Sequence, residues 1–258
     1  MRIDDDKYLN EWLEAAGGRG RIAKLWDDFK TRPHPPLDFS TEASAVFSAQ
    51  IEGNSIDLDA FMNSKLGETG LRAIKPKELA EIESLIEAYQ FAQSQTLDEK
   101  NLLAAHDKLA EPILPAPTRG RYRTQLMFVY SRDGIEYAAV EPEFVQEKMN
   151  ELFVDVDNLK RAGVGVINAF YHAALAHLVF AHIHPFADGN GRAARLLEKW
   201  LLAELLADSD AWLIQSEAHY KTRLPDYYRN IKLGPNYYLL DYDRCIPFLT
   251  MLPTSLEG

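Results

Sequence analysis

One long stretch without charged side chains limits what this chain can fold into. No Asp, Glu, Lys or Arg occurs from Ala162 to Ala187. A helix that is apolar on all sides is buried, either in a protein core or in a membrane. The stretch also contains several histidines, and Pro185 interrupts it near its end. We therefore expect a helix at the centre of a soluble domain rather than a membrane span.

The rest of the chain shows mostly helical periodicity. Apolar residues recur at three- and four-residue spacing, with Ser40 as an expected N-cap and Pro76 in a first turn. Two β-rich runs flank SRDG and predict one hairpin. The segment 236–258 has an ambiguous pattern. Helices are expected at 5–30, 40–54, from 76, 98–110, 144–152, 165–183, 191–207 and 216–232.

Composition limits the binding partners and the cellular compartment that we expect for this protein. Hydrophobic residues make up 47% of the 258 residues, enough for a packed core. The net charge of -11 disfavours nucleic acid and anionic membranes as partners. Cys245 is the single cysteine, so no internal disulfide can form, and the N-terminus shows no apolar leader. We expect a cytoplasmic protein.

The residues after the uncharged stretch predict an anion site. In HPFADGNGR, Pro185 ends one helix near His184, and another helix begins near Asn190. The first amides of the new helix lack partners within the helix and, with its dipole, attract an anion. Gly189 and Gly191 allow close approach of a phosphate to the backbone.

Charged and titratable side chains complete this junction. Arg192 and Arg195 lie on one side of the first turn and can add bidentate contacts to phosphates. Asp188 could hold Mg²⁺ against the phosphates, and His184 could act as a general base near neutral pH. These groups are the ones that phosphoryl or nucleotidyl transfer requires. The chain has no G-x-x-x-x-G-K-(S/T) sequence, so the site is not a P-loop.

HPFADGNGRAAR resembles the Fic family motif H-P-F-x-(D/E)-G-N-G-R-x-x-R at every defined position. GRYRTQLMFVY and VEPEFVQEKMNELF resemble the segment around the family's hairpin, called the flap. EIESLIEAYQFA resembles the helix that opens the family's core. The resemblance implies an all-α, mainly helical Fic fold with one β-hairpin flap. It also implies an N-terminal helical region at 1–74, a Fic domain at 75–235 and a C-terminal extension at 236–258 packed on the core.

The family resemblance implies a reaction and roles for these residues. Fic enzymes usually transfer AMP from ATP to a Ser, Thr or Tyr hydroxyl of a target protein. His184 would deprotonate that hydroxyl, and Asp188 would bind Mg²⁺. The flap would align the target by strand addition. The phosphates would be held by Gly189, Asn190, Gly191, Arg192 and Arg195, and the flap would comprise Gly134, Ile135, Glu136 and Tyr137.

A second signal lies upstream, in SAQIEGN. Ser48 and Glu52 are four residues apart on one face of a predicted helix, and Glu52 stands near its unfavourable C-terminal end. The stretch resembles (S/T)-x-x-x-E-(G/N), which self-inhibited Fic proteins carry. Because this helix, at about 40–53, precedes the core, the chain resembles the second class of that group. The resemblance implies that Glu52 pairs with Arg195 and keeps the γ-phosphate from its productive position.

Three functions fit these residues. The chain could be a self-inhibited protein adenylyltransferase, a hydrolase that removes AMP with Glu52 orienting water, or a non-catalytic module that senses nucleotide. Transfer of phosphate or UMP is also open, and a homo-oligomer is compatible with the sequence. The target protein, its acceptor residue and the release signal are not specified by the sequence.

Each residue also has a purely structural interpretation. Without its neighbours, His184 would be interpreted as a core histidine, and Glu52 as a solvent-facing acid. The histidines at 172, 177 and 182 are expected in the core or behind the site. Tyr227 and Tyr228 could border an adenine pocket or form a core pair. A solvated basic edge is the favoured interpretation of Arg119, Arg121 and Arg123.

Overall fold

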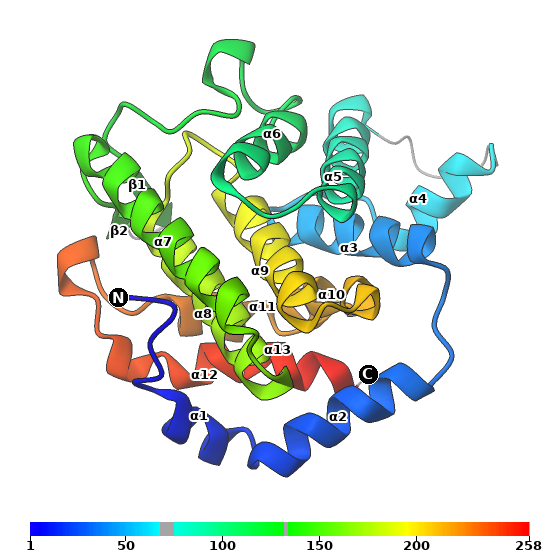
Figure 1. The fold of residues 1–258 in the computed structure, drawn as a ribbon. Coiled ribbons are helices and arrows are strands. Elements are labelled where there is room, and N and C mark those ends of the chain that lie inside the picture. Colours follow the sequence, from blue (N-terminus) through cyan, green and yellow to red (C-terminus); the bar gives the residue numbers. More distant parts are fainter. Residues whose placement is uncertain (68–74, 132–133, 258) are drawn as a thin grey trace.

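The computed structural model describes residues 1–67, 75–131 and 134–257 as a mainly helical molecule with one small hairpin (Figure 1). The strands are β1 (Phe128–Ser131) and β2 (Gly134–Ala138), and several 3-10 turns join the helices. The helices are α1 (Leu9–Ala15), α2 (Arg19–Thr31), α3 (Leu37–Ile51), α4 (Leu58–Lys65), α5 (Pro76–Ser94), α6 (Glu99–Leu109), α7 (Pro142–Ala162), α8 (Val166–Ile183), α9 (Asn190–Leu206), α10 (Ser216–Thr222), α11 (Leu224–Ile231), α12 (Ile246–Leu249) and α13 (Met251–Thr254). The predicted fold class, all-α with one hairpin, is confirmed.

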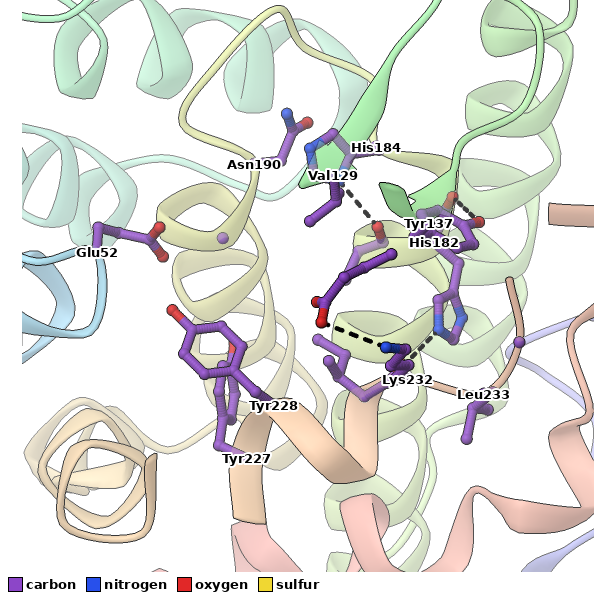
Figure 2. A pocket seen from close by; sticks show the side chains of 15 residues that line it. Glu52, Val129, Tyr137, His182, His184, Asn190, Tyr227, Tyr228, Lys232 and Leu233 are labelled. Atoms are coloured by element: carbon purple, nitrogen blue, oxygen red, sulfur yellow. Dashed lines mark hydrogen bonds and ion pairs between the residues drawn. The ribbon is translucent and has the colours of Figure 1, made fainter. Parts of the chain in front are cut away.

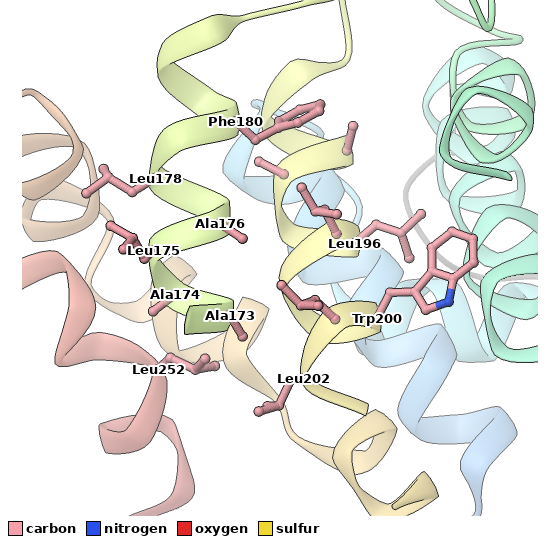
Figure 3. Close-up of a cluster of buried hydrophobic side chains, with 14 of the residues drawn as sticks. Ala173, Ala174, Leu175, Ala176, Leu178, Phe180, Leu196, Trp200, Leu202 and Leu252 are labelled. Carbon is pink, nitrogen blue, oxygen red and sulfur yellow. The ribbon is translucent and has the colours of Figure 1, made fainter. Parts of the chain in front are cut away.

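Helices α8 and α9 form the centre of the fold (Figure 1). Figure 3 shows the small residues Ala173 and Ala176 on the face of α8 that is turned toward α9, and both are buried. By length and composition α8 could cross a membrane, but 78% of its 18 residues are buried inside the fold. The uncharged stretch therefore forms a core helix, as expected.

The chain ends pack onto this centre. Trp12 of α1 lies 5.4 Å from the ring of Tyr171, and Trp26 of α2 contacts Phe170. The segment after residue 236 forms turns and short helices, which place Phe248 and Leu252 in the core. The three segments predicted at 1–74, 75–235 and 236–258 thus all contribute to one continuous apolar cluster.

Several helix boundaries differ from the sequence prediction. The helix expected at 5–30 is two helices, because Gly17 and Gly18 adopt positive φ angles of 83° and 91°. α3 begins at Leu37 rather than at Ser40, which lies buried inside the helix. α4 was not predicted, and α7 continues beyond residue 152. The helix expected at 216–232 divides near Arg223, just before a proline in the first turn of α11.

The hairpin lies beside the C-terminal end of α8. Its strands are antiparallel, with Phe128 opposite Ala138 and Val129 opposite Tyr137. The amide of Ala138 also donates to the carbonyl of Pro235, 3.0 Å away, which ties the hairpin to the segment after α11. The centre of the predicted SRDG turn, at 132–133, lies outside the described residues.

Candidate active site at the α8–α9 junction

A cavity of about 540 Å³ opens where the end of α3, the hairpin, the α8–α9 junction and α11 meet (Figure 2). It contains both the predicted base and the predicted inhibitory acid. Its lining residues are Glu52, Val129, Glu136, Tyr137, Ala181, His182, His184, Asn190, Gly191, Tyr227, Tyr228, Ile231, Lys232, Leu233 and Gly234.

His184 is the C-cap residue directly after α8 and adopts a left-handed conformation, with φ 53° and ψ 58°. Its Nδ1 lies 3.2 Å from the carbonyl oxygen of Ala181. Because a carbonyl can only accept, we assign the ring hydrogen to Nδ1, which leaves the Nε2 lone pair free. Burial lowers the pKa of the His184 imidazole, so the ring is neutral at physiological pH. A neutral ring with a free nitrogen is the form that a general base requires.

Two glycines leave the turn into α9 free of side-chain atoms. Gly189 has a φ of 79°, and a Cβ there would lie 3.1 Å from the Leu109 side chain. At Gly191, a Cβ would overlap a carboxylate oxygen of Glu52. The first-turn amides of α9 have no partners within the helix. Because the two glycines carry no side chains, an anion could approach these amides closely.

Asn190 holds the loop together. Its Oδ1 accepts from the amide of Phe186 at 2.8 Å, and its Nδ2 donates to the carbonyl of the same residue at 2.9 Å. Both ends of the carboxamide are therefore engaged within the loop. The predicted phosphate contact of Asn190 is consequently left to its backbone amide.

His106 of α6 supports the loop from below, a role that sequence reasoning missed. Its ring stacks on Phe186 with centroids 3.5 Å apart, and its Nε2 lies 2.9 Å from the carbonyl of Asp188. Its Nδ1 accepts from the amide of Gly120 at 3.0 Å. Burial lowers the pKa of His106 to about 4, which keeps the ring neutral. The sequence feature that could have indicated this role is the position of His106 on the apolar face of the helix predicted at 98–110.

Arg192 carries buried donors that nothing in the described chain satisfies. Its side chain is 8% exposed, and its nearest acid, Glu81, lies 3.9 Å away. Nε and Nη1 have no hydrogen-bond partner among the described residues. Leaving buried donors unpaired is costly. An anion at the N-terminus of α9 would satisfy them.

Asp188 is the one exposed carboxylate of the turn. Its Oδ1 accepts from the amide of Gly189 at 2.6 Å. The described residues contain no group of three or more His, Cys, Asp or Glu side chains that could hold a metal alone. A single carboxylate beside an anion site fits Mg²⁺, which usually binds through one or two carboxylates and substrate phosphates.

The structure brings Ser48, Glu52 and Arg195 together. The fully buried Arg195 donates from Nη2 to the Glu52 carboxylate at 2.8 Å and from Nε to the Ser48 hydroxyl at 2.9 Å. Burial opposes ionisation of Glu52, but Arg195 outweighs burial, and the pKa of the carboxyl lies below its ordinary value. With 29% of its side chain exposed, Glu52 lies at the wall of the cavity.

The two tyrosines of α11 have different surroundings. Tyr227 is buried, and its hydroxyl lies 3.3 Å from Nη1 of Arg195 and 3.0 Å from Nε2 of His177. Tyr228 is 46% exposed, lines the cavity and donates to the carbonyl of Ile51 at 2.9 Å. Both tyrosines line the cavity (Figure 2): Tyr227 from the core beside Arg195, and Tyr228 from the exposed surface.

The remaining histidines make structural contacts, as expected. His177 lies 2.8 Å from the buried carboxylate of Glu198, and His172 contacts the carbonyl of Ile3 at 2.7 Å. His182 lies 2.8 Å from the carbonyl of Ile231, and burial lowers its pKa to about 4.

The predicted flap residues lie on β2, along one wall of the cavity. Gly134 has a φ of 121°, and Ile135 is 59% exposed. Glu136 pairs with Lys232 at 3.3 Å, and the buried Tyr137 donates to the carbonyl of His182 at 2.6 Å (Figure 2). The position suits a docking edge, and docking itself stays a prediction.

The interpretation of Arg123 as part of a solvated basic edge is wrong. Its exposed fraction is 5%, and it contacts main-chain carbonyls around the junction. Arg121, two residues earlier, is exposed. The sequence offers no local signal that separates the two arginines.

Comparisons with known proteins find similarity to one family. A family model described as Fic/DOC family matches residues 96–202. The relative named protein adenylyltransferase Fic from Nematostella vectensis is 28% identical over 163 residues, which are 60% of this chain and 36% of the relative. Protein adenylyltransferase fic-1 from Caenorhabditis elegans is 30% identical over 160 residues, 57% of this chain and 28% of the relative. The chain thus spans about a third of the length of these relatives.

Two solved structures have a similar fold. A Fic family protein from Desulfovibrio desulfuricans G20 has a TM-score of 0.69 and 24% identity, covering 96% of this chain and 70% of that one. A Fic domain containing signaling protein from Bacteroides thetaiotaomicron has a TM-score of 0.68 and 21% identity, covering 91% of this chain and 92% of that one.

Proposed function

Because the chain belongs to the Fic/DOC family, we propose that it is a protein adenylyltransferase, which transfers AMP from ATP to a hydroxyl side chain of a target protein. The observation that carries the proposal is the juxtaposition of His184 with the open N-terminus of α9. A neutral imidazole with a free nitrogen lines the same cavity as Asn190 and Gly191, and the buried, partly unpaired Arg192 follows them in the first turn of α9.

ATP would bind with its phosphates on the first amides of α9. The glycines at 189 and 191 admit the phosphates, and the unpaired donors of Arg192 would bind their oxygens. Asp188 would hold Mg²⁺ against the phosphates, where the ion would neutralise charge on the leaving group. The part of the cavity beside Tyr228 could accommodate the rest of the nucleotide.

In the transfer step, His184 Nε2 would take the proton of the target hydroxyl. The hydroxyl oxygen would attack the α-phosphorus, and the bond from that phosphorus to the bridging oxygen of the pyrophosphate would break. The products are the adenylylated target and pyrophosphate. The α9 amides act electrostatically, on the charge that develops on the phosphates. The hairpin residues Gly134 to Tyr137 would dock the target's backbone as an added strand.

The same geometry supports inhibition by Glu52. Its carboxylate occupies a donor of Arg195 and the space above Gly191, where a phosphate oxygen would otherwise lie. We infer that the chain rests in this closed state and that transfer requires the carboxylate to leave. Removal of AMP from a modified protein is the second candidate, because Glu52 lines the same cavity as His184 and could orient a water there.

Mass spectrometry of the Glu52→Gly protein after incubation with ATP and Mg²⁺ tests the proposal. We expect the mass of one or more adenylyl groups on hydroxyl side chains, and none in the Glu52→Gly protein that also carries His184→Ala. An unmodified Glu52→Gly protein, with and without candidate targets, would contradict adenylyl transfer. Release of AMP from an adenylylated protein by the wild type, but not by Glu52→Gly, would favour the hydrolase.

A further inference from the structure

Arg123 is a buried cation without an acidic partner in the described part of the chain. Its side chain lies between the hairpin and the C-terminal end of α8, and the residue is 5% exposed. None of the ion pairs among the described residues includes it. A buried charge persists only where other polar groups replace its hydration, so its surroundings identify its role.

Carbonyl oxygens from the catalytic junction surround one side of this guanidinium. Nε donates to the carbonyl of His184 at 2.7 Å, and Nη2 also reaches the carbonyl of Ile183 at 3.4 Å. The main-chain amide of Arg123 donates to the carbonyl of Pro185 at 2.9 Å. The carbonyls of Ile183 and His184 end α8, at the negative end of its dipole, where a cation binds favourably.

The other side of the guanidinium donates hydrogen bonds to the segments before β1 and after β2. Nη1 donates to the carbonyl of Gln125, before β1, at 2.8 Å. Nη2 donates to the carbonyl of Val140, after β2, at 2.5 Å. One rigid group therefore connects the entry and the exit of the hairpin to the backbone of His184.

This connection matters because His184 is not in a relaxed backbone conformation. It has a φ of 53°, and a non-glycine residue keeps such a conformation only where its surroundings enforce it. We propose that Arg123 is the positioning residue that holds His184 in this conformation and couples the imidazole to the hairpin. The inference rests on the proposed function, in which the hairpin docks the target and His184 accepts its proton.

The proposal predicts different effects on kcat and on ATP affinity. Arg123 makes no contact with Arg192, Arg195 or the α9 amides among the described hydrogen bonds, so the phosphate site does not depend on it. Its loss should reduce kcat and leave ATP affinity unchanged. Lysine should not substitute, because a point charge cannot bridge carbonyls in several directions as a planar fork does.

The experiment uses the Glu52→Gly protein with Arg123→Lys, Arg123→Met or Arg123→Ala. We expect kcat to fall about 100-fold, the scale for misplacing a reacting group by about 1 Å, while ATP binding by calorimetry stays within about twofold. Millimolar guanidinium should restore part of the activity of Arg123→Ala. Arg121→Met, an exposed arginine on the same segment, is the matched control and should leave kcat unchanged.

Three results would overturn the inference: full activity in Arg123→Met, a parallel loss of ATP affinity, or no response of Arg123→Ala to guanidinium. Hydrogen exchange keeps the test independent of the proposed reaction. In Arg123→Ala without nucleotide, amides 183–186 and the hairpin amides should both exchange faster than in the parent. If Glu52→Gly transfers nothing but both regions respond, the coupling stands and the proposed function fails. If only one region responds, the coupling is wrong.

Discussion

Replacing Glu52 by glycine should activate the protein. Among the described residues, Glu52 is the one carboxylate that pairs with Arg195, and the substitution removes it. The guanidinium should nevertheless stay in place, because its Nε still donates to the Ser48 hydroxyl and its Nη1 to Tyr227. The change therefore frees a donor and the space above Gly191 without dismantling the site.

The size of the effect follows from the bond that is lost. A hydrogen bond between charged groups contributes about 1.5–3 kcal/mol. The Glu52 side chain is 29% exposed and keeps some hydration, so about 2 kcal/mol is appropriate. This energy corresponds to an open fraction of about 3%. The apparent affinity for productively bound ATP, and the rate at low ATP, should therefore rise about 30-fold in Glu52→Gly.

The assay is incorporation of α-labelled phosphate from ATP, at ATP concentrations below saturation. Glu52→Gln is the matched control: it keeps the side-chain size but loses the charge, so its rate should lie between those of wild type and Glu52→Gly. Adding His184→Ala should abolish incorporation. If Glu52→Gly is no faster than wild type, or if the amide variant stays fully inhibited, the ion pair with Arg195 is not the cause of inhibition.

Three further predictions concern affinity and stability. Arg192→Gln should weaken ATP binding by calorimetry about 10- to 100-fold and leave the thermal midpoint unchanged or higher, because the lost donors are unpaired in the folded chain. Asn190→Ala should destabilise by about 1–3 kcal/mol in denaturant unfolding, since the amide and carbonyl of Phe186 lose their partner. Burial lowers the pKa of His106 and of His182 to about 4. Because the unfolded rings titrate near about 6.5, stability should be complete above that pH and decline toward pH 4, and His106→Asn should flatten this decline in thermal melts.

The junction could be predicted from sequence because its conformation is determined locally. Pro185 ends α8, and the glycines at 189 and 191 leave α9 with an open N-terminus. The uncharged stretch likewise predicted a buried α8. The pairing of Glu52 with Arg195, 143 residues apart, came from a family resemblance. The only local hint was an acid at the unfavourable end of a helix.

The supporting residues could not be predicted because their partners are distant main-chain atoms. Carbonyls carry no side-chain identity, so nothing in the sequence says that His106 meets Asp188 or that Arg123 meets His184. The exposed Arg121 and the buried Arg123 look alike in composition, and only the packed fold separates them. The break at Gly17 and Gly18 was missed because the apolar spacing continues across it.

The contrast between Arg192 and Arg195 explains how one carboxylate could inhibit an open site. Each guanidinium nitrogen of Arg195 donates to Ser48, Glu52 or Tyr227, whereas Arg192, one turn away, keeps unpaired donors. Glu52 thus occupies the proposed position of one phosphate group, at Arg195, and leaves the donors of Arg192 free. The cavity of about 540 Å³ stays open beside it. A nucleotide could enter and still find one end of its phosphates displaced. The proposed inhibition would act on the pose of the substrate rather than on its access, so we expect a side-chain movement of Glu52 to relieve it without unfolding α3, whose inner face is buried.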